Sequence, residues 1–287
     1  MSRISYLYDV FNGLVLDAQM KSYKTSESHL CDQHMPFVKR GDLLLFDSYY
    51  PSFKRMFALH AKGVDFVFRM KENWWNCVNE LVQSGLDEQI VELTLPKEHH
   101  NLIKQYPHLK TTIQVRLIKK TNRKGETQVF CTSLLETTLY SRKAVMNLYK
   151  QRWGIEEAYK LIKCRLEVAD FSGLTARAIQ QDFYAKTMMI SLCNAFCFGI
   201  QPKAPKRQPV NRNKENKPRV PIINRTYALN QLKAILTHTA FSLEKLTHWL
   251  QKFRRRISNQ VEYSRRDQSS LRKFKSNMKF AISYKTV

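Results

Sequence analysis

Long apolar runs, paired cysteines and acidic residues are all scarce in this chain of 287 residues. No uninterrupted apolar stretch reaches the roughly 18 residues that a membrane-spanning helix needs. The most apolar stretch, residues 187–200, predicts a buried helix instead. The six cysteines form no CxxC pair. Cys193 and Cys197 lie one helical turn apart in that stretch, so we predict core thiols there rather than zinc ligands. No signal peptide is visible at Met1, so we expect a cytosolic protein.

Acidic residues number 24 against 48 lysines and arginines, which gives a formal net charge of +24. Such an excess of positive charge indicates a polyanionic partner, and nucleic acid is the first class to consider. A membrane surface is the alternative that charge alone leaves open. Hydrophobic residues make up 43% of the chain, which excludes global disorder and provides enough material for a packed core.

The first 70 residues alternate between strand patterns and helix patterns. Apolar and polar residues alternate over 4–19 around Asn12-Gly13, which predicts a β-hairpin. A continuous apolar run, Leu43–Phe46, ends on Asp47, as expected of a buried strand with an acidic residue at its end. The other predicted elements are a helix over 25–35 capped by Thr25 or Ser26, a helix over 52–62 ended by Gly63, and a strand over 65–70.

Residues 71–135 contain three further strand patterns, at 89–95, 111–120 and 127–134. Trp74 and Trp75 precede them, and two interpretations stay open. Either both side chains are exposed platforms on which a displaced base stacks, or one side chain is buried and the other lies on the surface.

The rest of the chain is predominantly helical and basic. Residues 174–200 predict one more helix of the core, and 226–256 return to helical periodicity. Between them, the basic and proline-rich segment 201–225 predicts a linker or an extended arm. The tail 257–287 mixes arginines and lysines with aromatic residues, which suits either nucleic-acid contact or a solvated charged tail.

A group of phosphate-seeking side chains surrounds one glutamate in residues 148–163. Tyr149, Arg152, Glu156 and Lys163 have the spacing Y-x2-R-x3-E-x6-K, which on a single α-helix places them within an arc of about 60°. Lys160 and Trp153 extend the same face. A carboxylate among such groups suits a metal ligand presented to a phosphodiester, since Arg and Lys bind and neutralise phosphate oxygens. The alternative is an amphipathic surface helix with i,i+4 ion pairs.

This spacing resembles the YREK signature of DDE transposases of the insertion-sequence-four group. Two further blocks agree with it in order and distance. Residues 41–52 resemble the block that carries the second catalytic aspartate, here Asp47, and residues 5–20 resemble the hairpin before it. The likeness extends to about residue 200. One difference follows Asp47, where Ser48-Tyr49 replaces the Arg-Gly that the family usually has, which alters the turn after the strand.

The resemblance implies a ribonuclease-H-like α/β fold, in which helices flank a mixed sheet, with a β-rich insertion and a basic, largely helical C-terminal region. The domains implied are 1–70 for the first part of the catalytic core, 71–135 for the insertion, 136–200 for the second part of the core, 201–225 for the linker and 226–287 for the C-terminal region.

The implied activity is cut-and-paste DNA transposition by metal-dependent phosphodiester hydrolysis and strand transfer. Asp47 and Glu156 would be ligands of a two-ion Mg²⁺ or Mn²⁺ site. Contacts to DNA would come from Tyr149, Arg152, Trp153, Lys160 and Lys163. The implied partners are the ends of an insertion sequence, the target DNA and a second transposase chain in a homodimer or with full-length transposase, in the bacterial cytoplasm near the nucleoid.

One acid of the family's set has no match in this sequence. In the family the first aspartate lies upstream of the hairpin, on the opening strand of the core. We therefore expect an N-terminally truncated chain that lacks this strand and its acid. Asp9 and Asp17 lie on the hairpin strands, away from the expected position, and neither is a convincing substitute. Three alternatives remain: a non-catalytic DNA-binding remnant or inhibitor, a nuclease of the same fold that does not join strands, and a ribosome-associated basic protein in which the signature spacing is accidental.

Overall fold

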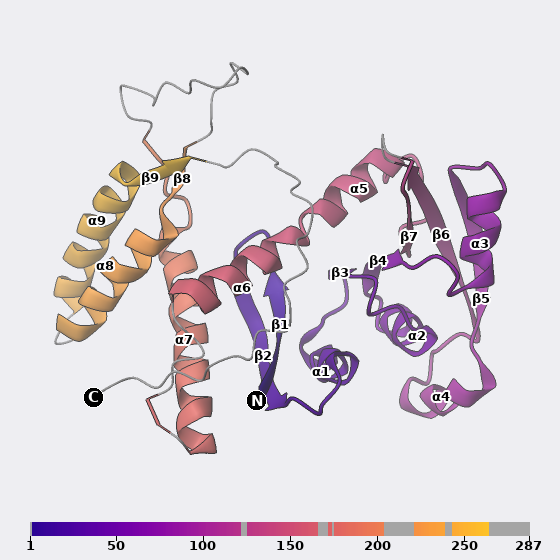
Figure 1. Cartoon of the computed structure of the whole chain (residues 1–287), viewed down its shortest axis with the longest axis horizontal. Coiled ribbons are helices and arrows are strands. Elements are labelled where there is room, and N and C mark those ends of the chain that lie inside the picture. The colour runs from indigo at the N-terminus through magenta and orange to yellow at the C-terminus, as the bar shows by residue number, and fades with distance from the viewer. Residues whose placement is uncertain are drawn as a thin grey trace. The chain divides into compact units, whose positions relative to one another are not determined.

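The computed structural model describes residues 2–121, 125–165, 172–173, 175–203, 221–238 and 243–263 (Figure 1). The chain forms two compact units. The first is built from residues up to 7 and from 16–154, and the second from 8–15 and from 155 onward. Among the described residues, no helix combines the length and the apolar character that crossing a bilayer requires.

The chain begins with the predicted hairpin, which is confirmed. Strands β1 (Ser2–Asp9) and β2 (Leu14–Ser22) form a two-stranded sheet, and Gly13 adopts a φ of 71° in the turn. The Asp9 carboxylate accepts hydrogen bonds from the backbone N–H groups of Phe11 and Asn12, at 2.9 and 3.1 Å. Burial acts to raise the pKa of Asp9, but hydrogen bonds from the Asn12 side chain and from these two N–H groups together lower it. The aspartate therefore stabilises the turn.

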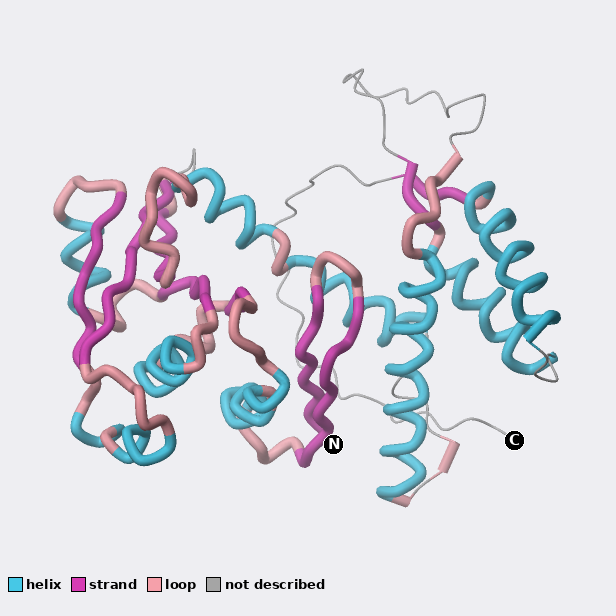
Figure 2. Tube along the Cα trace, turned by 180° about the vertical axis from the view of Figure 1, so that it is seen from behind, coloured by secondary structure: helices cyan, strands magenta, loops and turns pink. Residues whose placement is uncertain are grey.

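A five-stranded mixed sheet forms the centre of the first unit, with the strand order β3-β4-β7-β6-β5. The strands are drawn in magenta in Figure 2. β3 pairs with β4 in parallel, and the other three pairs are antiparallel. The strands are β3 (Leu43–Phe46), β4 (Asp65–Met70), β5 (Glu88–Thr94), β6 (Thr112–Thr121) and β7 (Thr127–Thr132). All five strand predictions are confirmed. The three strands of 71–135 share a sheet with β3 and β4, and the predicted division into domains stays a prediction.

Helices cover both faces of this sheet, so the unit has a mixed α/β architecture. The larger core packs side chains such as Phe46, Phe66 and Phe68 against the helices α1 to α4. Those helices and the short turns beside them are α1 (Glu27–Gln33), η1 (Met35–Phe37), α2 (Phe53–Ala61), α3 (Asn76–Gln83), η2 (Lys97–His99) and α4 (Asn101–Gln105). On the other face, Val67, Phe130 and neighbouring residues pack against α5 (Arg142–Lys150).

Serine side chains cap three helices of the first unit, and Ser26 is one of the two caps predicted for its helix. Ser26 accepts a hydrogen bond from the N–H of His29, and Ser52 accepts one from the N–H of Arg55. Ser141 does the same for Ala144 at the start of α5. Each serine satisfies a backbone donor that the first helical turn leaves without a partner.

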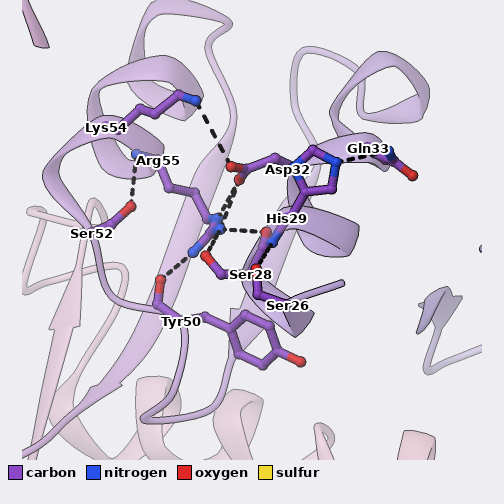
Figure 3. A network of polar contacts seen from close by, with 9 residues as sticks. All are labelled: Ser26, Ser28, His29, Asp32, Gln33, Tyr50, Ser52, Lys54 and Arg55. Carbon is purple, nitrogen blue, oxygen red and sulfur yellow. Dashed lines mark hydrogen bonds and ion pairs between the residues drawn. The ribbon is translucent and has the colours of Figure 1, made fainter. Parts of the chain in front are cut away.

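A buried arginine fixes the loop that follows β3 (Figure 3). Arg55 on α2 is 3% exposed and donates two hydrogen bonds to Asp32 Oδ1 on α1, at 3.1 and 2.7 Å. The same guanidinium donates to Ser28 and to the carbonyl oxygen of Tyr50. The Tyr50 N–H in turn donates to the carbonyl oxygen of Asp47 at 3.1 Å. Arg55 therefore connects α1, α2 and the turn that begins at Asp47.

The second unit is mainly helical. Its helices are α6 (Trp153–Arg165), α7 (Ala176–Cys197), α8 (Arg225–His238) and α9 (Leu243–Asn259), and the first two residues of α6 belong to the first unit. A small ribbon of β8 (Pro221–Ile223) and β9 (Val261–Tyr263) also belongs to the second unit. Cys193 and Cys197 are buried in it, as predicted. Most of the predicted linker (201–225) and most of the predicted basic tail (257–287) lie outside the described residues, namely 204–220 and 264–287.

The hairpin tip belongs to this second unit and is bound to α7, which is itself bound to α8 through Asn194. Asn194 on α7 donates from Nδ2 to the carbonyl oxygen of Gly13 and accepts from Arg225 at 2.6 Å. The N–H of Val15 donates to Ser191 Oγ at 3.2 Å. Asn194 is 6% exposed, so its amide is a buried polar group whose oxygen and nitrogen both have partners.

Candidate functional site

Asp47 lies directly after β3 and is half-buried. Leu43 and Leu45 of β3 pack in the core beneath α5, whereas Leu44 and Phe46 pack in the larger core on the opposite face. Because successive side chains of a strand alternate between faces, position 47 falls on the face that α5 covers. The Oδ1 atom accepts a hydrogen bond from the Ser48 N–H at 2.7 Å, and Oδ2 makes none with a residue that the structure describes.

Tyr149 lies near the end of α5 and faces the sheet. Its ring packs edge to face on Phe130, with the ring centroids 4.8 Å apart. The pKa of the Tyr149 hydroxyl is raised to about 12, mainly by burial and to a lesser extent by the Asp47 carboxylate. Arg152 and Arg69 act in the opposite direction on the same hydroxyl. The first unit therefore brings a carboxylate, a phenol and two guanidinium groups within electrostatic reach of one another.

Arg152 follows α5 directly, and its guanidinium carbon lies 5.6 Å from the centroid of the Tyr149 ring. Arg69 approaches from β4, where Asp65, Val67 and Arg69 alternate on the face that α5 covers. Arg69 was not singled out in the sequence. The sequence shows only an arginine in the mostly apolar segment DFVFRM. That Arg69 shares a sheet face with Asp47 follows from the pairing of β3 with β4.

The prediction of one continuous helix for the signature is wrong. α5 ends at Lys150 and α6 begins at Trp153, so Tyr149 and Glu156 belong to different helices. Between the two helices, Gln151, Arg152 and Gly154 donate to the carbonyl oxygens three residues earlier, at 2.9–3.1 Å. Bonds of this kind tighten the backbone to three residues per turn. The glycine that follows also has a low intrinsic preference for the helix. The helical arc predicted for the signature residues assumed about 100° per residue throughout, and this assumption does not hold across the turn between α5 and α6.

The remaining signature residues are distributed over the turn and α6. Trp153 is 54% exposed. Glu156 is half-buried and, like Lys160, belongs to the second unit. Lys160 forms an i,i+3 ion pair with Glu157 at 2.5 Å, whereas the alternative interpretation of this helix named i,i+4 pairs. The side chain of Lys163 lies outside the described residues. A metal site shared by Asp47 and Glu156 stays a prediction.

The two hairpin aspartates have structural partners. Asp17 Oδ2 lies 2.6 Å from Nδ1 of the buried His34 and also accepts from Gln19 at 2.8 Å. Asp9 stabilises the hairpin turn, as described above. Within the described residues, no group of three or more His, Cys, Asp or Glu side chains is arranged to hold a metal ion.

Aromatic and basic side chains surround the turn after Asp47. Tyr49 and Trp74 are each about half exposed, and the Lys71 ammonium lies 4.1 Å from the Trp74 ring and 6.0 Å from the Tyr49 ring. Trp75 differs, because it stacks on Phe53 at 4.1 Å beside the larger core. The two tryptophans therefore divide between core and surface. A hollow of about 220 Å³ adjoins this turn, lined by Ser48, Arg69, Lys71 and Gln128 among others.

Two comparisons with known proteins cover these residues. A family model described as "Transposase DDE domain" matches residues 2–192, a range that includes Asp47, Tyr149, Arg152 and Glu156. The transposase for insertion sequence element IS231E of Bacillus thuringiensis subsp. finitimus is 22% identical over 242 residues. That alignment covers 69% of this chain and 50% of the relative. The chain thus spans about half the length of this curated relative.

Proposed function

Since the chain belongs to the family of transposases with a DDE domain, we propose that it acts on DNA by metal-dependent cleavage and transfer of phosphodiester bonds. In the first step, a water oxygen attacks a phosphorus atom at the end of an insertion sequence. The bond from phosphorus to the 3′ oxygen breaks, and that oxygen leaves with a proton as a 3′-hydroxyl. In the second step this hydroxyl attacks a phosphodiester of target DNA, and the 3′ oxygen there leaves in the same way.

The observation that carries this proposal is the cluster of Asp47, Tyr149, Arg152 and Arg69 on one face of the sheet. The two guanidinium groups supply forked donors for phosphate oxygens and neutralise their charge. Tyr149 stays protonated at neutral pH because its pKa is about 12, so its hydroxyl is a donor to an anionic oxygen. We assign the parallel pair of β3 and β4 to a ribonuclease-H-like core that presents this cluster.

Asp47 and Glu156 are the proposed metal ligands of this chain. A carboxylate oxygen is a hard ligand of the kind that Mg²⁺ and Mn²⁺ prefer, and Oδ2 of Asp47 has no hydrogen bond to a described residue that would compete. When bound, a pair of such ions activates the attacking oxygen and stabilises the leaving oxygen. Tyr149, Arg152 and Lys163 are proposed to hold the DNA backbone near the scissile bond, supported by Lys160 and Trp153.

Metal affinity tests the ligand assignment without requiring turnover. Mn²⁺ binding is measured by calorimetry for the unmodified chain, for Asp47→Asn, for Glu156→Gln and for the double variant. Each single change is expected to weaken Mn²⁺ binding by at least about tenfold. The double variant is expected to lose less Mn²⁺ binding free energy than the two single variants lose in sum, since two ligands of one ion are not independent. The matched control is Glu92→Gln, an exposed carboxylate of β5. Unchanged Mn²⁺ affinity in both single variants overturns the assignment.

Products on DNA test the reaction. DNA that carries the ends of the sequence surrounding this gene is incubated with the chain and Mg²⁺. Joined products that disappear in Asp47→Asn support a transposase. Hydrolysed ends without joining support a nuclease of the same fold.

The contacts of Asp9 and Asp17 favour a second candidate function, because each carboxylate already has a structural role. A chain that holds only part of the acid set binds DNA without cutting it and inhibits by pairing with a complete transposase. Binding of DNA that is sensitive to salt, with no Mg²⁺-dependent product, favours this candidate.

A further inference from the structure

We propose that a basic hollow along α5 is a second contact surface for the DNA backbone, which guides a duplex toward Asp47. This inference deepens the proposed function and rests on it. The hollow has a volume of about 600 Å³ and lies between α5 and the strands β5 and β6. The residues that carry the argument are Arg116, Lys120, Arg142, Lys143, Asn147 and Lys150.

The positive charge of this hollow comes from three lysines. Arg116 is 1% exposed, forms an ion pair with Glu88 and donates to the carbonyl oxygen of Tyr140 at 2.6 Å. Arg142 forms an ion pair with Asp87. Each arginine and its acidic partner therefore carry almost no net charge as a pair.

Lys120, Lys143 and Lys150 form no ion pair with any residue that the structure describes. Among the described residues, the one polar contact of these three side chains is a hydrogen bond from Lys150 to the Asn147 side chain, at 3.1 Å. Three like charges around one hollow repel one another, and a polyanion relieves this repulsion when it binds.

The spacing along α5 suits an extended ligand rather than a single small anion. Lys143, Asn147 and Lys150 stand at i, i+4 and i+7, so they form a stripe on one face of the helix. The nine residues of α5 extend over about 13 Å, which corresponds to about four base-pair steps of duplex DNA.

The stripe is continuous with the candidate site. Tyr149, one residue before the last lysine of the stripe, faces Phe130 and lies within electrostatic reach of Asp47, and Arg152 follows directly. One helix therefore presents lysines on one side and the signature tyrosine on another. A backbone that follows the lysine stripe arrives at the end of α5, where the cluster around Asp47 begins.

The experiment measures binding of the full chain to a short DNA duplex of random sequence, in chelator so that no cleavage contributes. The triple variant Lys120→Gln, Lys143→Gln, Lys150→Gln is compared with the unmodified chain over a salt series. Loss of three phosphate contacts is expected to reduce the slope of log affinity against log salt by about 2.7. Between about 50 and 200 mM salt, the unmodified chain then loses about 40-fold more affinity than the variant does.

A charge-matched control separates this site from general electrostatics. Lys97→Gln, Lys104→Gln, Lys110→Gln removes three exposed lysines at and beside η2 and α4. The inference requires a much smaller effect on the salt slope from this control. Equal effects of the two triple variants overturn it, and so does tighter binding to an RNA duplex than to DNA. If the triple variant of the hollow does not fold, the double variant Lys143→Gln, Lys150→Gln, which changes only exposed side chains, must reduce the slope by about 1.8.

The outcomes also separate this inference from the proposed function. Salt-dependent DNA binding that is identical in the unmodified chain and in the hollow variants overturns only the inference. Absence of any DNA binding by the unmodified chain overturns the proposed function as well.

Discussion

The Asp47 carboxylate raises the pKa of the Tyr149 hydroxyl, although 102 positions separate the two residues in the sequence. Burial is the larger cause of the raised pKa, and the nearby guanidinium groups oppose it. Replacing the carboxylate by an amide of the same shape removes the contribution of Asp47 alone. We therefore expect Asp47→Asn to lower the pKa of Tyr149. The measurement is an NMR titration of tyrosine labelled at Cζ, with the signal assigned by Tyr149→Phe. The control Asp42→Asn, which changes an exposed carboxylate before β3, is expected to leave this pKa unchanged.

The raised pKa of Tyr149 also predicts how stability depends on pH. The folded state holds the hydroxyl proton more tightly than the unfolded state, whose tyrosine pKa is about 10. This contribution to stability is complete below about pH 10 and is lost as the pH rises toward about 12. Tyr149→Phe is expected to lose less unfolding free energy than the unmodified chain between about pH 10 and 12. Urea denaturation at several pH values measures this, and parallel pH profiles of the two proteins would refute it.

Arg55 and Lys54 provide a matched test of the network beneath the Asp47 turn. Both side chains pair with Asp32, but Arg55 is almost fully buried, whereas the Lys54 side chain is 53% exposed and its Nζ lies 3.9 Å from the carboxylate. We expect Arg55→Met to lower the free energy of unfolding by about 3 kcal/mol, because partners in α1 and the turn lose a buried donor. Lys54→Ala is expected to cost less than about 1 kcal/mol. Urea midpoints measure both, and similar costs would contradict the role assigned to Arg55.

Alanine substitutions at Gly13 and Gly85 distinguish the cost of backbone strain from the cost of close packing. Both have a positive φ, of 71° and 75°, but a Cβ at Gly13 would lie 3.0 Å from Asn194 Nδ2, whereas a Cβ at Gly85 meets nothing within 4 Å. Gly85→Ala is expected to cost about 1 to 2 kcal/mol from the left-handed backbone alone. Gly13→Ala should cost about 1 kcal/mol more, since the buried bond from Asn194 is disturbed. Thermal unfolding of both variants tests this order, and a smaller cost at Gly13 would show that the hairpin tip tolerates a side chain.

Local patterns predicted the elements of the fold, because hairpin, cap and strand signals each depend on neighbouring residues. Asn12-Gly13, Ser26, Ser52 and Ser141 all occupy the positions that these rules indicate. The sequence did not predict that the strands of 71–135 join β3 and β4 in one sheet. Pairing between distant strands leaves no local signal, and β4 and β7 are separated by more than 50 residues.

The candidate site was predicted in part for the same reason. Asp47 ends an apolar strand, which is a local signal, whereas Arg69 is recognisable only once β4 is known to lie beside β3. The interruption between α5 and α6 was missed because helical periodicity was extended through Gln151 and Arg152, where the backbone bonds change from four residues to three. Only tertiary packing distinguishes Trp74 from Trp75, since the two are adjacent and identical in type.

Removal of the Trp75 side chain is expected to lower stability much more than removal of the Trp74 side chain. Trp75 stacks on Phe53 with an interplanar angle of 1°, so we expect Trp75→Ala to cost about 2 to 3 kcal/mol of unfolding free energy. Trp74 is 50% exposed and contacts Lys71, so we expect Trp74→Ala to change stability by no more than about 0.5 kcal/mol. Urea denaturation measures both costs. A large loss of stability in Trp74→Ala would assign that side chain to the core and leave no surface tryptophan at this turn.

The exposed tryptophan also tests the prediction that a base stacks beside the Asp47 turn. If Trp74 stacks on a base, Trp74→Ala should lower the affinity for single-stranded DNA by about 1 to 3 kcal/mol. Trp74→Phe, which keeps an aromatic face, should restore most of that affinity because stacking does not require the indole N–H. Fluorescence anisotropy of labelled DNA measures the three affinities. Equal affinities for the unmodified chain and Trp74→Ala would exclude base stacking at Trp74, and the contact with Lys71 would then be its only assigned role.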